Sequence, residues 1–431
     1  METLNSSGAL AHVQCADPRH PKFGQQGFLY WEHGICLGFF TEPQPAFAHV
    51  PHWNAKGYQV APGFFDMGLA LAPPQTPYST SVSPDLQALI DGGWTGGVVL
   101  PLPPFRTDLP LFQQGWQKAL DATGLKLMLA GSVTTDEHAL APIYEIASWG
   151  TKVFSHGTAT LADSLQLMHV LDLIKETGGL YMHLPGEPSL HPQGQVHPSP
   201  LGMSMGLAGI PEEAESIGMW RDVQMAKKTG QPLHWWQISS AAHLNLLDEA
   251  KAYGITAGVS AAHLWWNDQS IEGYAVHRKL MPPLRTEKNR LALLKAVEEG
   301  KFACITSGHM GWTTTEKQAP FTSSPFGAHT LRSSALAVLD LVQTGALSLK
   351  HAIQALAYGP RDLLKIKQPQ FLEGAPADYT LFSTNHATHV PPYEGYMAGE
   401  ANPWAGTTLH AKIAGVWVDG VFKGQELDLQ G

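Results

Sequence analysis

Short apolar runs alternate with amphipathic segments along the middle of the chain, from Pro62 onward. The apolar runs have strand length and include GGVVLPLP, LKLMLAGSV, TKVFSHG, GLYMHLPG, QPLHWWQISS, GITAGVSAAHL and FACITSGH. The segments between them, such as EEAESIGMWRDVQMAKKTG and EKNRLALLKAVEEGK, have helical periodicity. Continuous apolar strands that alternate with helices are typical of buried parallel sheets. About seven or eight such units in roughly 300 residues predict an α/β fold of the (β/α)8 barrel type.

Both ends of the chain have a β pattern instead. GFLYWEHGICLGFF near the N-terminus is an apolar β-type run, and ADYTLFS and AKIAGVWVDGVFKG follow the last helical segment. The Asp-Gly pair in the last of these runs predicts a hairpin turn. We therefore expect residues 1–61 and 371–431 to form one small composite β-sandwich domain, which flanks a barrel formed by residues 62–370.

Composition excludes several classes of protein. Hydrophobic residues make up 44% of the 431 residues, which predicts a folded protein with a large core. No apolar run has membrane-spanning length, and the N-terminus lacks the pattern of a secretory signal. Cys15, Cys36 and Cys304 are too widely spaced for a disulfide framework, which favours the cytoplasm. A net charge of −10 without a Lys/Arg run argues against a nucleic-acid partner.

Several segments, in their order and spacing, resemble the dihydroorotases of the amidohydrolase superfamily. They are PGFFDM, LGMSMGLAGIPEEAESIGMWRDVQMAKKTG, PPLRTEKNRLALLKAVEEG, EKQAPFTSSPFG and LEGAPADYTLF, and they extend from Pro62 to about Phe382. The resemblance implies a distorted TIM barrel of the amidohydrolase type. It also implies a zinc-bound hydroxide as nucleophile and an aspartate on the last strand that moves the proton. Zinc is essential to such chemistry because it lowers the pKa of bound water from about 15.7 to about 7.

Most positions that correspond to the family's metal ligands hold residues that do not fit this role. The His-x-His pair of the first strand falls on Gly68 and Ala70, which have no donor atoms. The bridging acid falls on His156, a later histidine on Gln237, and the catalytic aspartate on Gly308. A catalytic zinc needs three protein ligands and an open position. The resemblance therefore implies zinc in active relatives, and the substitutions predict that this chain has no zinc, no other cofactor and no catalytic residue.

Other family positions are also altered or retained. The arginine that grips the substrate carboxylate falls on Ala72, the last histidine falls on Trp312, and the asparagine of the M-P-N-T loop is absent from LPLPPFRT. One family ligand position, His183, is retained. The predicted vestigial pocket consists of Asp66, Gly68, Ala70, His156, His183, Gln237, His263, Arg285, Gly308 and His309.

Several of these residues have two interpretations. His183 could hold a metal with His156, His263 or His309, but we favour buried histidines that bond to backbone or water. The pairs Trp235–Trp236 and Trp265–Trp266 could line a ligand pocket, but we expect at least one Trp of each pair to fill the volume left by metal and substrate. Arg285 fits an anion site and a helix-start ion pair equally well. Gly68 and Gly308 could make room for a new ligand, although loss of chemical constraint with neighbouring tryptophans taking up the space is favoured.

The resemblance leads to a hypothesis about function. Some bacterial chains of this family are non-catalytic structural partners of aspartate transcarbamoylase, the preceding enzyme of pyrimidine biosynthesis. We expect this chain to be such a cytoplasmic pseudoenzyme, to form an oligomer with the transcarbamoylase catalytic chain, and to bind neither nucleic acid nor membrane. One alternative is an active zinc-dependent cyclic amidohydrolase with a rearranged metal site built from His156, His183 and His309. The other is a small-molecule binding protein that uses a tryptophan-lined pocket.

Overall fold

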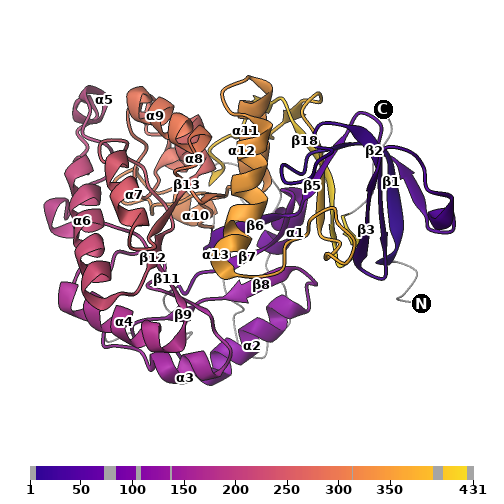
Figure 1. Ribbon diagram of the computed structural model, residues 1–431. Coiled ribbons are helices and arrows are strands. Elements are labelled where there is room, and N and C mark those ends of the chain that lie inside the picture. The colour runs from indigo at the N-terminus through magenta and orange to yellow at the C-terminus, as the bar shows by residue number, and fades with distance from the viewer. Residues whose placement is uncertain are drawn as a thin grey trace.

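The computed structural model describes residues 6–71, 84–102, 108–135, 138–312, 314–391 and 401–424. Figure 1 shows a barrel surrounded by helices and, at one side of it, a sheet that combines strands from both ends of the chain. The predicted α/β barrel with an added β domain is therefore confirmed.

Parallel strands in chain order form the barrel, and the last of them returns to the first. Only Ala130 separates β8 from β9 in the chain, so these two short strands occupy a single strand position of the barrel. An isolated bridge between Ala70 and Met310 closes the barrel between β14 and β6. Nearly all strand residues are buried, as expected for a parallel sheet covered on both faces. The barrel strands are β6 (Phe64–Leu69), β7 (Trp94–Val99), β8 (Lys126–Leu129), β9 (Gly131–Ser132), β10 (Val153–Ser155), β11 (Leu180–His183), β12 (Leu233–Trp235), β13 (Thr256–Ser260) and β14 (Cys304–Thr306).

Some of the helices that cover the barrel begin or end at capping residues that the sequence supplies. Asp163 accepts hydrogen bonds from two backbone N–H groups at the start of α4, and Gly178 and Gly230 end α4 and α6 in the left-handed conformation. The main helices are α1 (Pro84–Asp91), α2 (Pro110–Asp121), α3 (Ile143–Ser148), α4 (Ser164–Thr177), α6 (Glu212–Thr229), α7 (Leu244–Lys251), α9 (Glu287–Glu298) and α11 (Leu331–Gln343). Shorter ones are α5 (Pro200–Ser204), α8 (Ala261–Trp265), α10 (Thr314–Lys317), α12 (Leu349–Ile353), the π-helical η6 (Gln354–Tyr358) and α13 (Gly359–Leu364).

The β domain is one hydrogen-bonded sheet, and its N-terminal and C-terminal strands meet where β5 pairs with β15. Alternate residues of β2 belong to different apolar clusters, so both faces of that strand are covered. The predicted Asp-Gly hairpin is confirmed, because Asp419 and Gly420 join the last two strands with φ angles of 48° and 73°. The strands are β1 (Gly8–Cys15), β2 (Gln26–Glu32), β3 (Ile35–Phe40), β4 (His52–Asn54), β5 (Gln59–Pro62), β15 (Tyr379–Ser383), β18 (Lys412–Val418) and β19 (Val421–Lys423).

The segment between β15 and β18 leaves this sheet and packs on the barrel. Its hairpin of β16 (Thr388–His389) and β17 (Thr408–Leu409) contacts α11, and Trp404 is fully buried in the apolar cluster of the barrel. Asn402 donates a hydrogen bond to Ser333 on α11. The predicted domain limits at residues 61 and 371 stay predictions, since contacts cross between the two parts.

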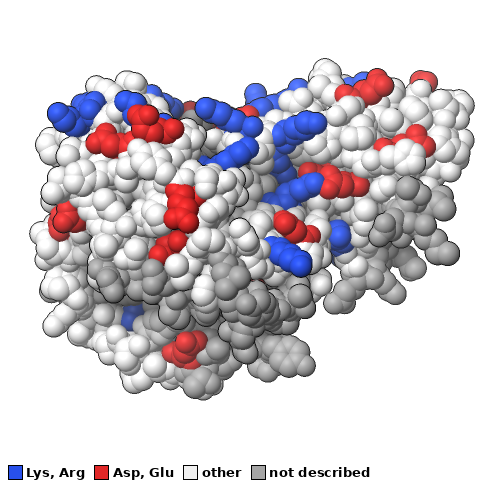
Figure 2. All heavy atoms as spheres, turned by 90° about the horizontal axis from the view of Figure 1, so that it is seen from below, with Lys and Arg blue, Asp and Glu red and all other residues white. Residues whose placement is uncertain are grey.

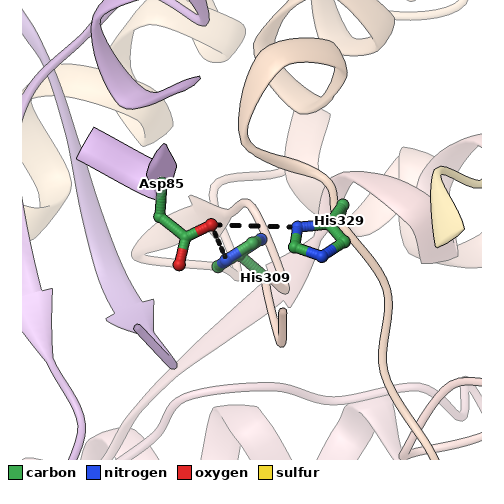
Figure 3. Close-up of side chains that lie close together, drawn as sticks. All are labelled: Asp85, His309 and His329. Carbon is green, nitrogen blue, oxygen red and sulfur yellow. Dashed lines mark ion pairs between the residues drawn. The ribbon is translucent and has the colours of Figure 1, made fainter. Parts of the chain in front are cut away.

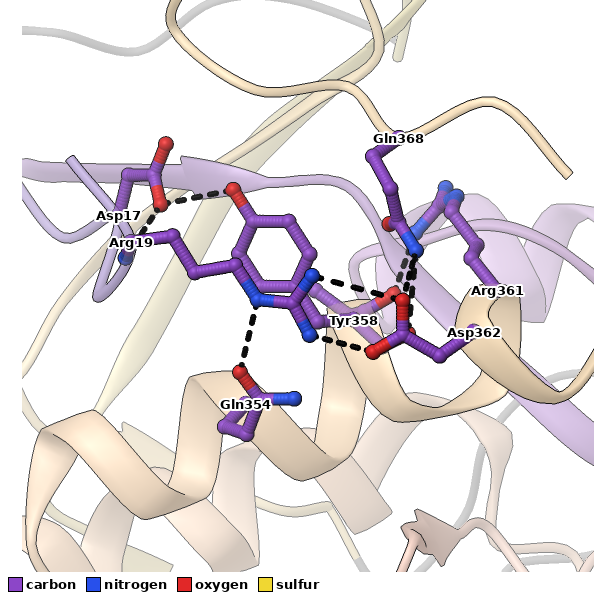
Figure 4. A network of polar contacts seen from close by, with 8 residues as sticks. Asp17, Arg19, Gln354, Tyr358, Arg361, Asp362 and Gln368 are labelled. Carbon is purple, nitrogen blue, oxygen red and sulfur yellow. Dashed lines mark hydrogen bonds and ion pairs between the residues drawn. The ribbon is translucent and has the colours of Figure 1, made fainter. Parts of the chain in front are cut away.

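A polar network joins the β domain to the last helical turns of the barrel (Figure 4). Tyr358 of η6 donates a hydrogen bond of 2.7 Å to Asp17, whose other carboxylate oxygen accepts the backbone N–H of Phe371. Arg19 lies over the Tyr358 ring and pairs with Asp362 of α13. Because Asp17 is 1% exposed, these contacts fix the orientation of the two parts.

The surface has mixed charge. Figure 2 shows Lys and Arg beside Asp and Glu along the hollow between the two parts of the molecule. A cavity of about 660 Å³ between the β domain and the N-terminal ends of β6 and β8 is lined by both signs of charge, including Lys126, Arg361, Asp378 and Asp419. Among the residues that the structure describes, no helix has the length and apolarity needed to cross a membrane.

Candidate functional site

Most of the residues predicted for the vestigial pocket lie at or near the C-terminal ends of the barrel strands, where enzymes of this fold place their chemistry. Asp66 and Gly68 are on β6, His183 ends β11, and Gln237 and His309 follow β12 and β14. The position predicted for the substrate-gripping arginine, Ala72, and residues 103–107 of the loop LPLPPFRT lie outside the described residues.

Trp236 occupies the space next to Gly68. A Cβ atom at Gly68 would lie 2.7 Å from Cε3 of the indole, closer than such atoms approach in folded proteins. Trp236 is 2% exposed and belongs to the apolar cluster inside the barrel, together with Phe65 and Met67 of β6. Trp236 thus packs against Gly68, while the expectation that a Trp of each pair fills the volume left by metal and substrate stays a prediction. Gly68 therefore leaves no room for a metal-binding side chain.

Asp66 is held inside the barrel by backbone groups. Its Oδ1 accepts the N–H of Gly68 and its Oδ2 accepts the N–H of Ser307, both at 3.1 Å. Burial raises the pKa of this fully buried carboxyl, and the hydrogen bonds from Ser307 and Gly68 offset part of that effect. Asp66 thus joins the first barrel strand to the last.

His183, the retained family residue, has both ring nitrogens engaged. Arg221 of α6 approaches Nε2 at 3.2 Å, and because a guanidinium can only donate, Nε2 accepts this hydrogen bond. Nδ1 therefore carries the proton and faces the hydroxyl of Tyr181 at 3.1 Å. Burial, and then the charge of Arg221, hold the pKa of His183 well below its usual value, so the ring is neutral.

Arg221 is itself fixed by its other contacts. It donates to Asp222 Oδ1 and to the carbonyl of Ala162 at 2.9 Å. The second carboxylate oxygen of Asp222 accepts a hydrogen bond of 2.8 Å from the Trp235 indole. Burial raises the pKa of Asp222 to about 6, although Arg221 opposes the shift. Nε2 of His183 thus lies between the Arg221 guanidinium and Asp222 Oδ2, which is 3.5 Å away.

His263 and Gln237 form a second internally bonded group. His263 Nδ1 lies 2.7 Å from Ser260 Oγ and 3.4 Å from Gln237 Nε2, while its Nε2 donates to the carbonyl of Pro282 at 3.0 Å. Burial lowers the pKa of His263 to about 4. Gly308 lies beside this group and has a φ angle of +65°. A Cβ atom at position 308 would lie 2.9 Å from the Cβ atom of Ser260. A carboxylate side chain at position 308 would be strained for both reasons.

Arg285 is also satisfied within the protein. It is 3% exposed and donates to Ser239 Oγ and to the carbonyl of Ile210. Its charge stabilises the ionised form of buried Glu215, whose carboxylate accepts two backbone N–H groups after β12. These contacts favour a structural role for Arg285 over an anion site.

The remaining predicted residues have separate partners. His156 Nδ1 lies 3.0 Å from Thr134 Oγ1, and burial lowers the pKa of His156. Trp312 donates its indole N–H to the carbonyl of Phe326. Ala70 donates its backbone N–H to the carbonyl of His309 at 3.2 Å across the seam between β6 and β14.

One group of metal-binding residue types does come together, but it is not the predicted group. Asp85 at the start of α1, His309 after β14 and His329 before α11 have ligand atoms that all lie within 4.8 Å of one another (Figure 3). All three side chains are buried. The alternative site of His156, His183 and His309 does not appear as such a group among the described residues, because His309 faces Asp85 instead.

The residues at the zinc position that the sequence resemblance implied do not fit a zinc ion. Gly68 and Ala70 have no ligand atoms, and both nitrogens of His183 are engaged. Gln237 offers only a neutral amide next to His263. Fewer than the three ligands of a catalytic zinc therefore converge there.

Sequence reasoning missed Arg221, Asp85 and His329. Arg221 lies in the middle of an amphipathic helix, where nothing in the pattern distinguishes it from a solvated charge. Asp85 and His329 belong to no family motif that we recognised, and their contact joins positions 244 residues apart, the difference between 329 and 85. Of the three clustered residues, only His309, which follows a strand, was predicted from the sequence to belong to a site.

Comparison with known proteins finds no matching family model, but it finds many similar sequences. A dihydroorotase of Carboxydothermus hydrogenoformans is 28% identical over 386 residues, which cover 87% of this chain and 89% of that protein. A dihydroorotase-like protein of Pseudomonas aeruginosa is 27% identical over 404 residues, with 92% and 94% covered.

Solved structures with the same fold include hydantoinases. The L-hydantoinase (dihydropyrimidinase) from Arthrobacter aurescens superposes with a TM-score of 0.80 at 16% identity, covering 96% of this chain and 95% of that one. The dihydropyrimidinase from Brevibacillus agri gives a TM-score of 0.77 at 16% identity, with 96% and 94% covered. At this identity the likeness establishes the barrel fold, and it says nothing further of this chain's chemistry.

Proposed function

We propose that this chain, a homologue of dihydroorotases and dihydroorotase-like proteins, is a non-catalytic pseudoenzyme of pyrimidine biosynthesis that serves as a structural partner of the aspartate transcarbamoylase catalytic chain. The observation that carries the first half of the proposal is the contact between Arg221 and His183 Nε2. The guanidinium supplies a permanent positive charge where the relatives' chemistry requires a metal that activates water.

The packing beside this contact supports the same conclusion. Trp236 fills the space that a side chain at position 68 would need, and Gly308 has a backbone conformation that disfavours the catalytic aspartate. Restoring one ligand would therefore not restore the chemistry, because the others are absent and the space is taken.

The partner half of the proposal rests on the family resemblance and on the outer surface. Ile217 and Trp220, one turn apart on α6, are 45% and 60% exposed. Exposed aromatic residues of this kind are typical anchors of protein interfaces. A retained fold around an altered site is consistent with selection for assembly, since most substitutions destabilise a protein.

Activity measurement tests the first half directly. The purified chain, with and without added Zn²⁺, should interconvert dihydroorotate and carbamoyl aspartate no faster than buffer does. A homologous dihydroorotase, such as that of Carboxydothermus hydrogenoformans, serves as the positive control in the same assay. Chelator-sensitive turnover that disappears in the variant His183→Ala would contradict the proposal and favour an active amidohydrolase.

A further inference from the structure

We propose that Asp85, His309 and His329 form a binding site for a borderline divalent transition-metal ion such as Zn²⁺, at the seam between the first and last barrel strands. This site is separate from the family's metal position, and it goes beyond the proposed function. It also revises the expectation of a zinc-free chain, because two of its three residues lie outside every motif that the resemblance supplied.

The spacing of the ligand atoms fits a metal better than it fits direct pairing. Asp85 Oδ1 lies 3.6 Å from His309 Nε2 and 3.9 Å from His329 Nδ1. Both separations exceed the usual length of a hydrogen bond. With zinc–ligand bonds of about 2.0–2.2 Å, neighbouring ligand atoms of a tetrahedral site are about 3.4 Å apart. A small inward movement of the two rings would therefore place three ligands around one ion.

His329 is prepared for this role by its other nitrogen. Its Nε2 lies 2.8 Å from the carbonyl of Trp312, so Nε2 carries the proton and Nδ1 presents its lone pair to Asp85. A histidine that ligates through one nitrogen and donates the other to a backbone carbonyl is the usual arrangement at metal sites.

His309 is the weaker of the two imidazole ligands. Among the described residues its Nε2 has no hydrogen-bond partner, although it is buried and directed at Asp85. Its Nδ1 lies 3.4 Å from the backbone N–H of Thr330, a long contact. Metal binding requires the proton of the neutral ring to be on Nδ1, so the Thr330 contact is given up when the ion binds.

The donor set and its surroundings indicate the class of metal. Two imidazoles and one carboxylate suit Zn²⁺, Co²⁺ or Ni²⁺, whereas Mg²⁺ and Ca²⁺ prefer oxygen ligands throughout. Gly311 adjoins both rings, and a Cβ there would lie 3.2 Å from His309 Nε2 and 2.9 Å from His329 Cε1. Glycine at this position thus keeps side-chain atoms away from the proposed ion.

The position of the site implies a structural effect. The ion would connect the start of α1 to the segments after β14 and before α11, where the Ala70–Met310 bridge closes the barrel. An ion that binds the folded chain and not the unfolded one raises the melting temperature. Removal of the ion with a chelator is therefore expected to lower the melting temperature, a measurement that does not depend on enzymatic activity.

Metal binding can be measured on the full chain. The protein is stripped with a chelator, incubated with one equivalent of Zn²⁺ or Co²⁺, desalted and analysed for metal, visible absorption of Co²⁺ and melting temperature. We expect about one tightly held ion and a Co²⁺ spectrum typical of tetrahedral coordination. His329→Ala and Asp85→Asn should bind at least about tenfold more weakly, while the matched control His183→Ala should bind as the parent does.

The outcomes separate this inference from the proposed function. Failure of the stripped parent chain to retain an ion would overturn the site even if a variant misfolds, since that measurement needs no substitution. Unchanged binding in both ligand variants, or loss of binding in His183→Ala, would also overturn it. Turnover of dihydroorotate would contradict the proposed function alone.

Discussion

At the scale of single residues, the contact between Gly68 and Trp236 leaves no room for a side chain at position 68. The indole lies against the Cα of Gly68, and a Cβ there would be 2.7 Å from Cε3. Trp236 is part of the apolar cluster inside the barrel, so it cannot move without disturbing its neighbours.

Gly68→Ala is therefore expected to destabilise the protein by about 1–3 kcal/mol, the usual effect of overpacking. Trp236→Leu should also destabilise it, through a cavity. The double variant should be more stable than the sum of the two effects predicts, by about 0.5–3 kcal/mol, because the smaller side chain makes room for the methyl group. Denaturant unfolding of the four proteins measures this coupling, and strictly additive effects would contradict the packing argument.

His234 predicts a pH dependence of stability. It is fully buried between Thr256 and Cys304, and burial lowers its pKa to about 3. In the unfolded chain its pKa is about 6.5, so below that pH the unfolded state binds a proton that the folded state does not. The stability contributed by neutral His234 is thus present above about pH 6.5 and is lost as the pH falls toward about 3.

The variant His234→Asn tests this linkage. Between pH 7 and pH 5 the parent protein should lose about 2 kcal/mol more of its free energy of unfolding than the variant loses. The other titrating groups are common to both proteins, so the difference isolates position 234. Parallel curves for the two proteins over this range would show that His234 has no such shift.

At the scale of elements, α6 has buried polar contacts on its inner face and exposed apolar side chains on its outer face. Its inward side places Arg221 against His183, and Asp222 against the Trp235 indole. Its outer side exposes Ile217 and Trp220. The first turn of the helix contains Glu212, Glu213 and Glu215, whose negative charges stabilise the helix N-terminus. One helix therefore holds a cation beside His183 on its inner side and exposes an apolar pair on its outer side.

The π-helical segment η6 couples the β domain to the barrel, and Tyr358→Phe tests that coupling. The hydroxyl of Tyr358 donates to buried Asp17, and its removal leaves that carboxylate with one donor fewer. We expect a loss of about 1–3 kcal/mol in the free energy of unfolding. Gln354→Ala removes only an exposed contact to Arg19 and should cost much less. Equal effects of the two variants on thermal or denaturant unfolding would argue against a special role for Asp17.

At the scale of the whole molecule, the barrel was predictable because the hydrophobic pattern of each short segment indicates its strand or helix. Runs such as GGVVLPLP and LKLMLAGSV are mostly apolar, and strands β7 and β8 form at those places. The substitutions at Gly68, a predicted ligand position, and Gly308, the predicted position of the catalytic aspartate, were also assigned from the sequence, and their effect on function stays a prediction. The contact of Arg221 with His183 was not predictable, because it depends on how α6 is rotated against β11. Asp85 and His329 likewise meet only through closure of the barrel.

The exposed pair Ile217 and Trp220 gives the partner hypothesis a site that can be tested. A stable interface buries more than about 1,000 Å² and depends on a few apolar or aromatic anchors near its centre. Removing such an anchor usually costs about 2–4 kcal/mol of binding, a roughly 30-fold to 1,000-fold loss of affinity. If α6 is part of the interface with the transcarbamoylase chain, Trp220→Ala should weaken the complex by that amount and leave the fold intact, because the side chain is 60% exposed.

The measurement is co-expression with the transcarbamoylase of the same organism, followed by size-exclusion chromatography with mass detection and a binding titration. Leu291→Ala serves as the matched control, since Leu291 is 53% exposed on α9, a different helix. Loss of affinity in both variants would place the interface elsewhere or indicate a general surface effect. Separate elution of the two parent chains at micromolar concentration would remove the structural-partner hypothesis and favour ligand binding as the function of this fold.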